Sequence, residues 1–99
     1  MSDATGSLTG AVIIGRNEGE RLKRCIASAR AQLNVIVYVD SGSSDGSAEH
    51  AESAGVSVVR LDMSKPFSAG RARNAGFQRL KESRRDLRFV QFIDGDCEL

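Results

Sequence analysis

Residues 35–46 read VIVYVDSGSSDG, and this stretch decides the fold class. Its first five residues are all β-branched or aromatic, which is typical of a strand buried on both faces of a parallel sheet. Asp40 ends the strand, and the Ser- and Gly-rich residues that follow predict a turn leading into a helix. A strand that leads through a turn into a helix is the repeating unit of parallel α/β sheets.

The same alternation extends in both directions along the chain. Apolar runs predict three more strands, and apolar residues at three- and four-residue spacing predict the helices. The remaining expected elements are strands at Ala11–Ile14, Val56–Leu61 and Phe89–Ile93, and helices at Glu18–Gln32, from about Ser47 to Ala54, and at Ser68–Ser83. We therefore expect an α/β fold of the Rossmann-like three-layer α/β/α type, with a parallel four-stranded sheet.

The helices should each present one apolar face to that sheet. The expected buried positions are Leu22, Cys25, Ile26, Ala29 and Leu33 on the first helix, and Ala69, Ala72, Gly76 and Leu80 on the third.

Composition narrows the function classes. The chain has 99 residues and a formal net charge of +1, which does not favour nucleic acid as a partner. No apolar run approaches the roughly 18 residues needed for a membrane span. Cys25 and Cys97 lie far apart without a CxxC motif, which predicts reduced thiols and a cytoplasmic protein, or one at the cytoplasmic face of the membrane in its full-length form.

Ligands of open parallel sheets bind beyond the carboxyl ends of the strands, so the loops at that edge carry the candidate site. Asp94 and Asp96 flank Gly95 after the fourth strand, which we expect to be buried. Paired carboxylates at such a position suit a hard cation, Mn²⁺ or Mg²⁺, although Asp-Gly-Asp is also an ordinary turn sequence. Asp40 ends a neighbouring strand, and Arg73 lies near the start of the third helix, where phosphate binding is favoured.

Four motifs in this order resemble family 2 glycosyltransferases. They are Ile13-Ile14-Gly15-Arg16-Asn17-Glu18, Val39-Asp40-Ser41-Gly42-Ser43-Ser44-Asp45-Gly46, Ala72-Arg73-Asn74 and Phe92-Ile93-Asp94-Gly95-Asp96. Their order and spacing match the N-terminal half of that family's GT-A fold, over residues 10–99, after a flexible leader at residues 1–9.

The resemblance implies a site for a nucleotide-sugar donor with a UDP, GDP or dTDP carrier. Asp96 would bind the metal that bridges the diphosphate, and Asp94 would lie beside it near the ribose or donor sugar. The loop with Gly15, Asn17 and Glu18 would approach the nucleotide. The remaining implied nucleotide-binding residues are Asp40 and Ser41, which would read the base, and Arg73.

Two departures from the family pattern matter. The base-reading loop commonly has a second aspartate where this chain has Ser41, which leaves the base open. Catalytic domains of the family are also longer than this chain, so we expect a truncated GT-A fold with no catalytic residue assigned. The catalytic base would lie beyond Leu99, and the chain alone would bind nucleotide weakly at most and would be inactive. An edge strand left exposed in this way predicts self-association, and the acceptor stays unknown.

Two alternatives remain open at this point. A nucleotidyltransferase-like or other α/β nucleotide-binding enzyme also uses carboxylates and a metal. It usually has a Gly-rich, basic loop after the first strand, whereas Gly15–Gly19 is short and acidic. A non-catalytic α/β module would use the same loops only as turns.

Overall fold

The computed structural model describes residues 9–33, 35–83 and 87–95, and these form seven alternating elements. The strands are β1 (Thr9–Gly15), β2 (Val35–Asp40), β3 (Ser57–Arg60) and β4 (Phe89–Asp94), and the helices are α1 (Glu20–Gln32), α2 (Ser47–Ser53) and α3 (Ala69–Ser83). The predicted alternation is confirmed, with boundaries that shift by one or two residues.

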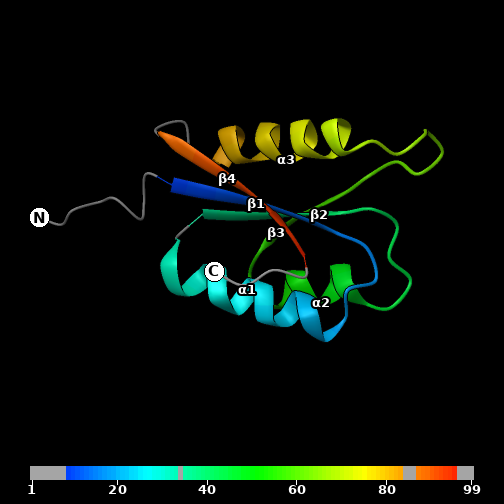
Figure 1. Cartoon of the computed structure of the whole chain (residues 1–99), viewed down its shortest axis with the longest axis horizontal. Helices are drawn as coiled ribbons and strands as arrows, with labels where there is room; N and C mark the ends of the chain where they lie inside the picture. Colours follow the sequence, from blue (N-terminus) through cyan, green and yellow to red (C-terminus); the bar gives the residue numbers. More distant parts are fainter. Residues whose placement is uncertain (1–8, 34, 84–86, 96–99) are drawn as a thin grey trace, which may run out of the picture.

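The four strands form one parallel sheet in the order β3-β2-β1-β4. Helix α3 covers one face, and α1 and α2 cover the other, so the molecule has three layers (Figure 1). This arrangement confirms the predicted α/β fold and is consistent with a partial GT-A fold. In the described part of the chain, no helix has both the length and the hydropathy required to span a membrane.

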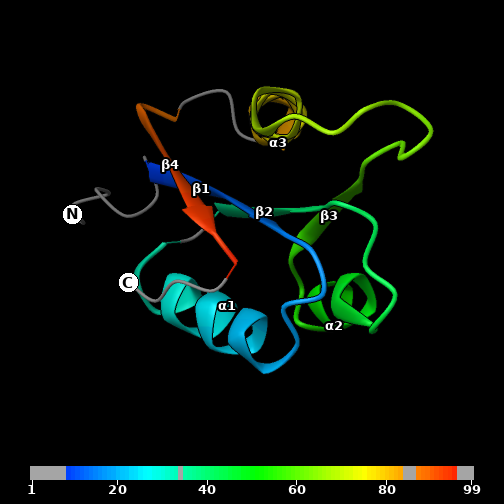
Figure 2. The same ribbon diagram turned by 45° about the vertical axis from the view of Figure 1, so that its right-hand side comes forward.

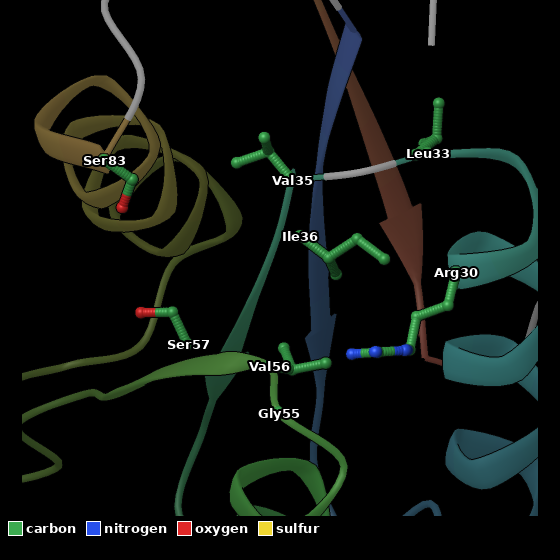
Figure 3. Close-up of a pocket in the computed structure, with 8 residues that line it drawn as sticks. All are labelled: Arg30, Leu33, Val35, Ile36, Gly55, Val56, Ser57 and Ser83. Carbon is green, nitrogen blue, oxygen red and sulfur yellow. The ribbon is translucent and has the colours of Figure 1, made fainter. Parts of the chain in front are cut away.

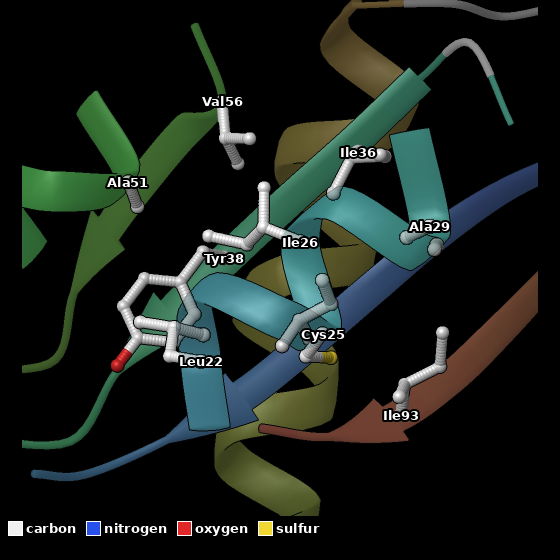
Figure 4. Close-up of a cluster of buried hydrophobic side chains, with 11 residues drawn as sticks. Leu22, Cys25, Ile26, Ala29, Ile36, Tyr38, Ala51, Val56 and Ile93 are labelled. Carbon is white, nitrogen blue, oxygen red and sulfur yellow. The ribbon is translucent and has the colours of Figure 1, made fainter. Parts of the chain in front are cut away.

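Each face of the sheet has its own apolar core. The core under α1 and α2 contains Tyr38, Ile13 and the predicted face of α1 (Figure 4). Leu22, Cys25, Ile26 and Ala29 are buried, and Leu33 packs at the margin. The core under α3 is smaller and consists of Val12, Val37, Val39, Ala72 and Leu80 with partly buried neighbours. A fully buried residue such as Leu22 stabilises the fold by about 1.5–3 kcal/mol.

Helix α1 begins at Glu20, two residues later than the pattern predicts. Asn17 and Gly19 have φ angles of 52° and 55°, a left-handed conformation that a right-handed helix cannot contain. The β1–α1 loop is therefore longer by these residues than its apolar spacing indicates.

The prediction of the buried face of α3 is wrong for one residue. Ala72, Gly76 and Leu80 are buried, but Ala69 is exposed. The neighbouring Gly70 also faces open space, since a Cβ added there would meet no atom within 4 Å.

Strand β4 forms an edge of the described sheet, and the prediction that it is buried is only partly correct. Ile93 is buried, whereas Phe89 and Phe92 are 64% and 46% exposed. An edge strand has a neighbouring strand on one side only. Its side chains therefore contact fewer neighbours and stay more exposed than those of a central strand.

Candidate nucleotide-binding site

The motif loops meet at the carboxyl edge of the sheet, as the sequence predicts. Figures 1 and 2 show the β1–α1, β2–α2 and β3–α3 connections on the same side of the molecule, where β1, β2 and β3 end. Gly15 lies opposite Asp40 in the β1–β2 pair, and Ile14 lies opposite Asp94 in the β1–β4 pair. Three of the four chain segments that carry the predicted residues are therefore direct neighbours, and Arg73 lies on the fourth, α3.

The structure explains why a glycine lies between the two aspartates. The Gly95 amide donates a 2.9 Å hydrogen bond to the Ile14 carbonyl, so β4 continues to pair with β1 at this point. A Cβ on Gly95 would lie 3.3 Å from that carbonyl oxygen and 3.4 Å from the Gly15 Cα. Both glycines are buried, which lets the β1 and β4 loops approach closely.

Asn17 joins the β1–α1 loop to the β2–α2 loop. The backbone amide of Asn17 donates to Ser43 Oγ at 2.9 Å, and its side-chain Oδ1 accepts from the Ser44 backbone amide at 2.8 Å. Glu18 also lies in the first loop, where its carboxylate accepts a 3.0 Å hydrogen bond from Arg21 Nε. The two Asn17 bonds fix the two loops relative to each other, and the Glu18 bond ties the first loop to α1.

Asp40 is buried, with 4% of its surface exposed. Its Oδ1 accepts a 2.8 Å hydrogen bond from the Tyr38 hydroxyl, and its Oδ2 accepts a 2.9 Å bond from the Ser43 amide. Burial of the Tyr38 phenol, together with its hydrogen bond to Asp40, raises the pKa of Tyr38. Asp40, which the pattern alone left without a structural role, thus holds the β2–α2 loop in place.

Ser41 faces the other side of the sheet from Asp40 and Tyr38, because successive residues at the end of a strand alternate between faces. It is only 5% exposed, and its Oγ forms no hydrogen bond with any described residue. A buried hydroxyl without a partner is costly, which makes Ser41 a candidate for contact with a ligand.

Ser41 lines a hollow of about 280 Å³ on the α3 side of the carboxyl edge. The other lining residues are Ile14, Gly15, Arg16, Met63 and Phe67. Met63 and Phe67 were not predicted as site residues. Their signal in the sequence is the presence of two large apolar side chains in the otherwise polar loop 62–68.

Asp94 lies on the same side of the sheet as this hollow, because it pairs with Ile14, which packs towards α3. Its side chain is exposed and forms no hydrogen bond or ion pair with another described residue. Asp96, the predicted metal ligand, lies outside the described residues. The described part of the chain holds no cluster of three or more His, Cys, Asp or Glu side chains suited to a metal. Mg²⁺ often binds through one or two carboxylates plus substrate phosphates, so an accessible Asp94 fits such a site.

The two arginines near the start of α3, Arg71 and Arg73, differ in their surroundings. Arg73 is exposed near the start of the helix. Arg71 instead directs its guanidinium into the loop 62–68, where it donates to the backbone carbonyls of Asp62, Lys65 and Pro66. Of the two, Arg73 is the one whose side chain is accessible to a phosphate.

A second hollow, of about 290 Å³, lies at the opposite end of the sheet (Figure 3). It is lined by residues around Arg30 and Gly55, and the Arg30 guanidinium donates a 2.7 Å hydrogen bond to the Ala54 carbonyl. None of the motif loops reaches it, so the first hollow is the candidate site.

Comparison with known proteins agrees with this geometry. The model of the family "Glycosyl transferase family 2" matches residues 11–99. A TPR repeat-containing protein of Synechococcus elongatus is 37% identical over 59 residues, which cover 60% of this chain and 15% of that protein. No solved structure matches the chain significantly. The match to the family model spans all four motif loops, and the chain belongs to glycosyl transferase family 2.

Proposed function

We propose that this chain binds the nucleotide-sugar donor of a glycosyltransferase, with UDP, GDP or dTDP as the carrier and Mn²⁺ or Mg²⁺ at the diphosphate. In the full-length enzyme, the sugar would pass to an acceptor hydroxyl. The observation that carries this proposal is the position of the accessible Asp94 beside the hollow that contains the Ser41 hydroxyl, which has no hydrogen-bond partner among the described residues.

The base of the nucleotide is assigned to the hollow. Ligand pockets are mostly apolar and contain a few polar groups that fix orientation, and Ile14, Met63, Phe67 and the Ser41 hydroxyl match that description. Asp40 would act through the shape of its loop, since both of its oxygens already accept hydrogen bonds within the protein. Asn17 and Glu18 would support the nucleotide in the same way, through the loop that they stabilise.

The diphosphate is assigned to the open edge next to the hollow. Asp94 and Asp96 would hold the divalent cation that members of this family generally use. A bound cation would stabilise the negative charge that develops on the leaving diphosphate. Arg73 would add a guanidinium for the phosphate oxygens, and the buried Gly15 would let the β1 loop lie close to the nucleotide.

Two further properties belong to the proposal. The proposed location is cytoplasmic, or at the cytoplasmic face of the membrane in the full-length protein. No catalytic base is assigned to a described residue, so the test measures binding and not turnover.

The experiment is a calorimetric titration of the chain with UDP, GDP and dTDP, each with and without Mg²⁺. We expect binding of at least one nucleotide, and we expect Mg²⁺ to strengthen it. Absence of binding by all three nucleotides, with and without Mg²⁺, would contradict the proposal.

A further inference from the structure

The Arg71 side chain donates hydrogen bonds to the backbone of the loop 62–68 at several points. Arg71 Nη1 donates to the carbonyls of Lys65 and Pro66 at 3.3 and 2.9 Å, and its Nη2 donates to the carbonyl of Asp62. A guanidinium offers several donors in a rigid plane, so a single Arg71 side chain can hold three carbonyls at fixed positions. Arg71 is half-buried in this arrangement.

Other hydrogen bonds complete the loop. Asp62 Oδ1 accepts from the amide and the hydroxyl of Ser64 at 3.0 and 2.6 Å. Ser68 Oγ accepts from the Arg71 amide at 3.1 Å, which caps the start of α3. The loop is therefore an ordered connection whose ends are both tied to the first turn of α3.

This loop presents two large apolar side chains to the hollow. Met63 and Phe67 are 41% and 51% exposed, although burial of such side chains is normally favourable. Met63 also packs on the β2–α2 loop, since a Cβ at Gly42 would lie 3.0 Å from Met63 Cγ. An exposed apolar wall that shares a hollow with an unpaired, buried hydroxyl is suited to a flat ring with apolar faces and a polar edge.

We propose that Arg71 is a positioning residue that holds Met63 and Phe67 as an apolar wall across from Ser41, and that this wall determines the affinity for the base of the nucleotide. The inference rests on the proposed donor site and adds a role for the loop 62–68 and its arginine. It assigns Arg71 to the loop, in contrast to Arg73, which is assigned to the phosphates.

Methionine methyl NMR tests this directly, because Met1 and Met63 are the only methionines of the chain. With ¹³C-methyl methionine, Met63→Leu identifies the Met63 signal. Titration with UDP in the presence of Mg²⁺ should shift that signal, and titration with inorganic pyrophosphate should not. The two probes share a diphosphate and differ in the base, so their comparison separates the hollow from the metal site.

The Arg71→Ala variant should change the Met63 methyl signal of the free protein and lower the affinity for UDP. Without ligand, the Met63 methyl signal should move towards the position of a solvent-exposed methionine. The dissociation constant for UDP should rise about fivefold to tenfold, because only part of the population retains the ordered wall. Pyrophosphate should bind as before. Arg71→Lys should recover part of the UDP affinity. Arg88 is an exposed arginine just before β4, and Arg88→Ala should change neither the Met63 signal nor the UDP affinity.

Three results would overturn the inference. If Arg71→Ala weakens UDP and pyrophosphate equally while the Met63 signal stays in place, Arg71 acts on the phosphates and the donor site itself still stands. If the Met63 signal moves without loss of UDP affinity, the wall does not act on the base. If the parent chain binds neither pyrophosphate nor any of UDP, GDP and dTDP, the proposed function fails together with the inference. Phe67→Ala changes an exposed side chain and leaves the Arg71 hydrogen bonds intact, so it tests the wall even if Arg71→Ala unfolds.

Discussion

Asp40 and Ser41 are consecutive residues, both almost fully buried, yet only one of them has its hydrogen bonds satisfied by the protein. Asp40 accepts from Tyr38 and Ser43, and the Ser41 hydroxyl makes no bond with any described residue. The first residue builds the loop, and the second is the group that a ligand would complete. This division predicts opposite consequences for substitutions at the two positions.

Ser41→Ala should lower affinity without lowering stability. The substitution removes a buried hydroxyl that has no partner, so thermal unfolding should show no loss and a gain of up to about 1 kcal/mol. Loss of the hydrogen bond to the base should weaken nucleotide binding about threefold to tenfold. Ser47→Ala is the matched control, because Ser47 is equally buried but donates a 2.6 Å hydrogen bond to Asp45. It should destabilise the fold by about 1 kcal/mol. Loss of stability in Ser41→Ala would contradict the assignment of its hydroxyl to a ligand.

Tyr38→Phe should destabilise the chain by about 1–3 kcal/mol, because it leaves a buried oxygen of Asp40 without its donor. Chemical denaturation measures this effect. An unchanged midpoint would show that the hydrogen bond adds nothing to the folded state.

The same phenol makes stability depend on alkaline pH. Desolvation and the contact with Asp40 raise the pKa of Tyr38 in the folded state above its value in the unfolded chain. A raised pKa means that the folded state holds the proton more tightly. This contribution to stability is therefore complete below pH of about 10, and it is lost as the pH rises beyond that value. Tyr38 is the only tyrosine, so its ultraviolet absorbance reports the titration, and ionisation near pH 10 without unfolding would contradict the assignment.

Gly76 and Gly70 lie on the same helix, and alanine substitutions at these two positions should change the stability in opposite directions. A Cβ at Gly76 would lie 2.9 Å from Val39 Cγ2 and closer still to Val12 Cγ1. Gly76→Ala should therefore cost about 1–3 kcal/mol through overpacking against the sheet. Gly70→Ala meets no atom within 4 Å and should stabilise α3 by about 0.5–1 kcal/mol through helix propensity. Equal effects in thermal unfolding would mean that α3 does not pack on β1 and β2 as described.

The exposed edge of β4 predicts self-association of this chain at high concentration. Phe89 and Phe92 are exposed on an edge strand, and such strands pair readily with other chains. Light scattering should show a species larger than a monomer. Phe92→Ser should reduce this association, and Gln91→Ser on the same strand should leave it unchanged. A monomer at all concentrations would count against the prediction.

The sequence predicts the elements well because their apolar spacing directly reflects burial on the two faces of a sheet. The buried face of α1 and the meeting of the motif loops both follow from such local patterns. Residues whose roles depend on tertiary geometry are harder to predict. The positive φ angle of Asn17 makes α1 begin later than predicted, Ala69 is exposed, and Asp40 accepts a hydrogen bond from the Tyr38 hydroxyl. Met63 and Phe67 line the hollow from a loop that Arg71 contacts from α3, a tertiary arrangement that apolar spacing along the chain does not reveal.

The most direct test of the donor site is the effect of Mg²⁺ on nucleotide affinity in Asp94→Asn, measured by calorimetry beside Glu82→Gln. Both variants lose one exposed carboxylate, but Glu82 lies near the end of α3, away from the motif loops. We predict that Mg²⁺ strengthens binding of UDP, GDP or dTDP to the parent chain and to Glu82→Gln. In Asp94→Asn, we predict that this Mg²⁺-dependent affinity falls about tenfold or more. Equal enhancement by Mg²⁺ in all three proteins would contradict the account.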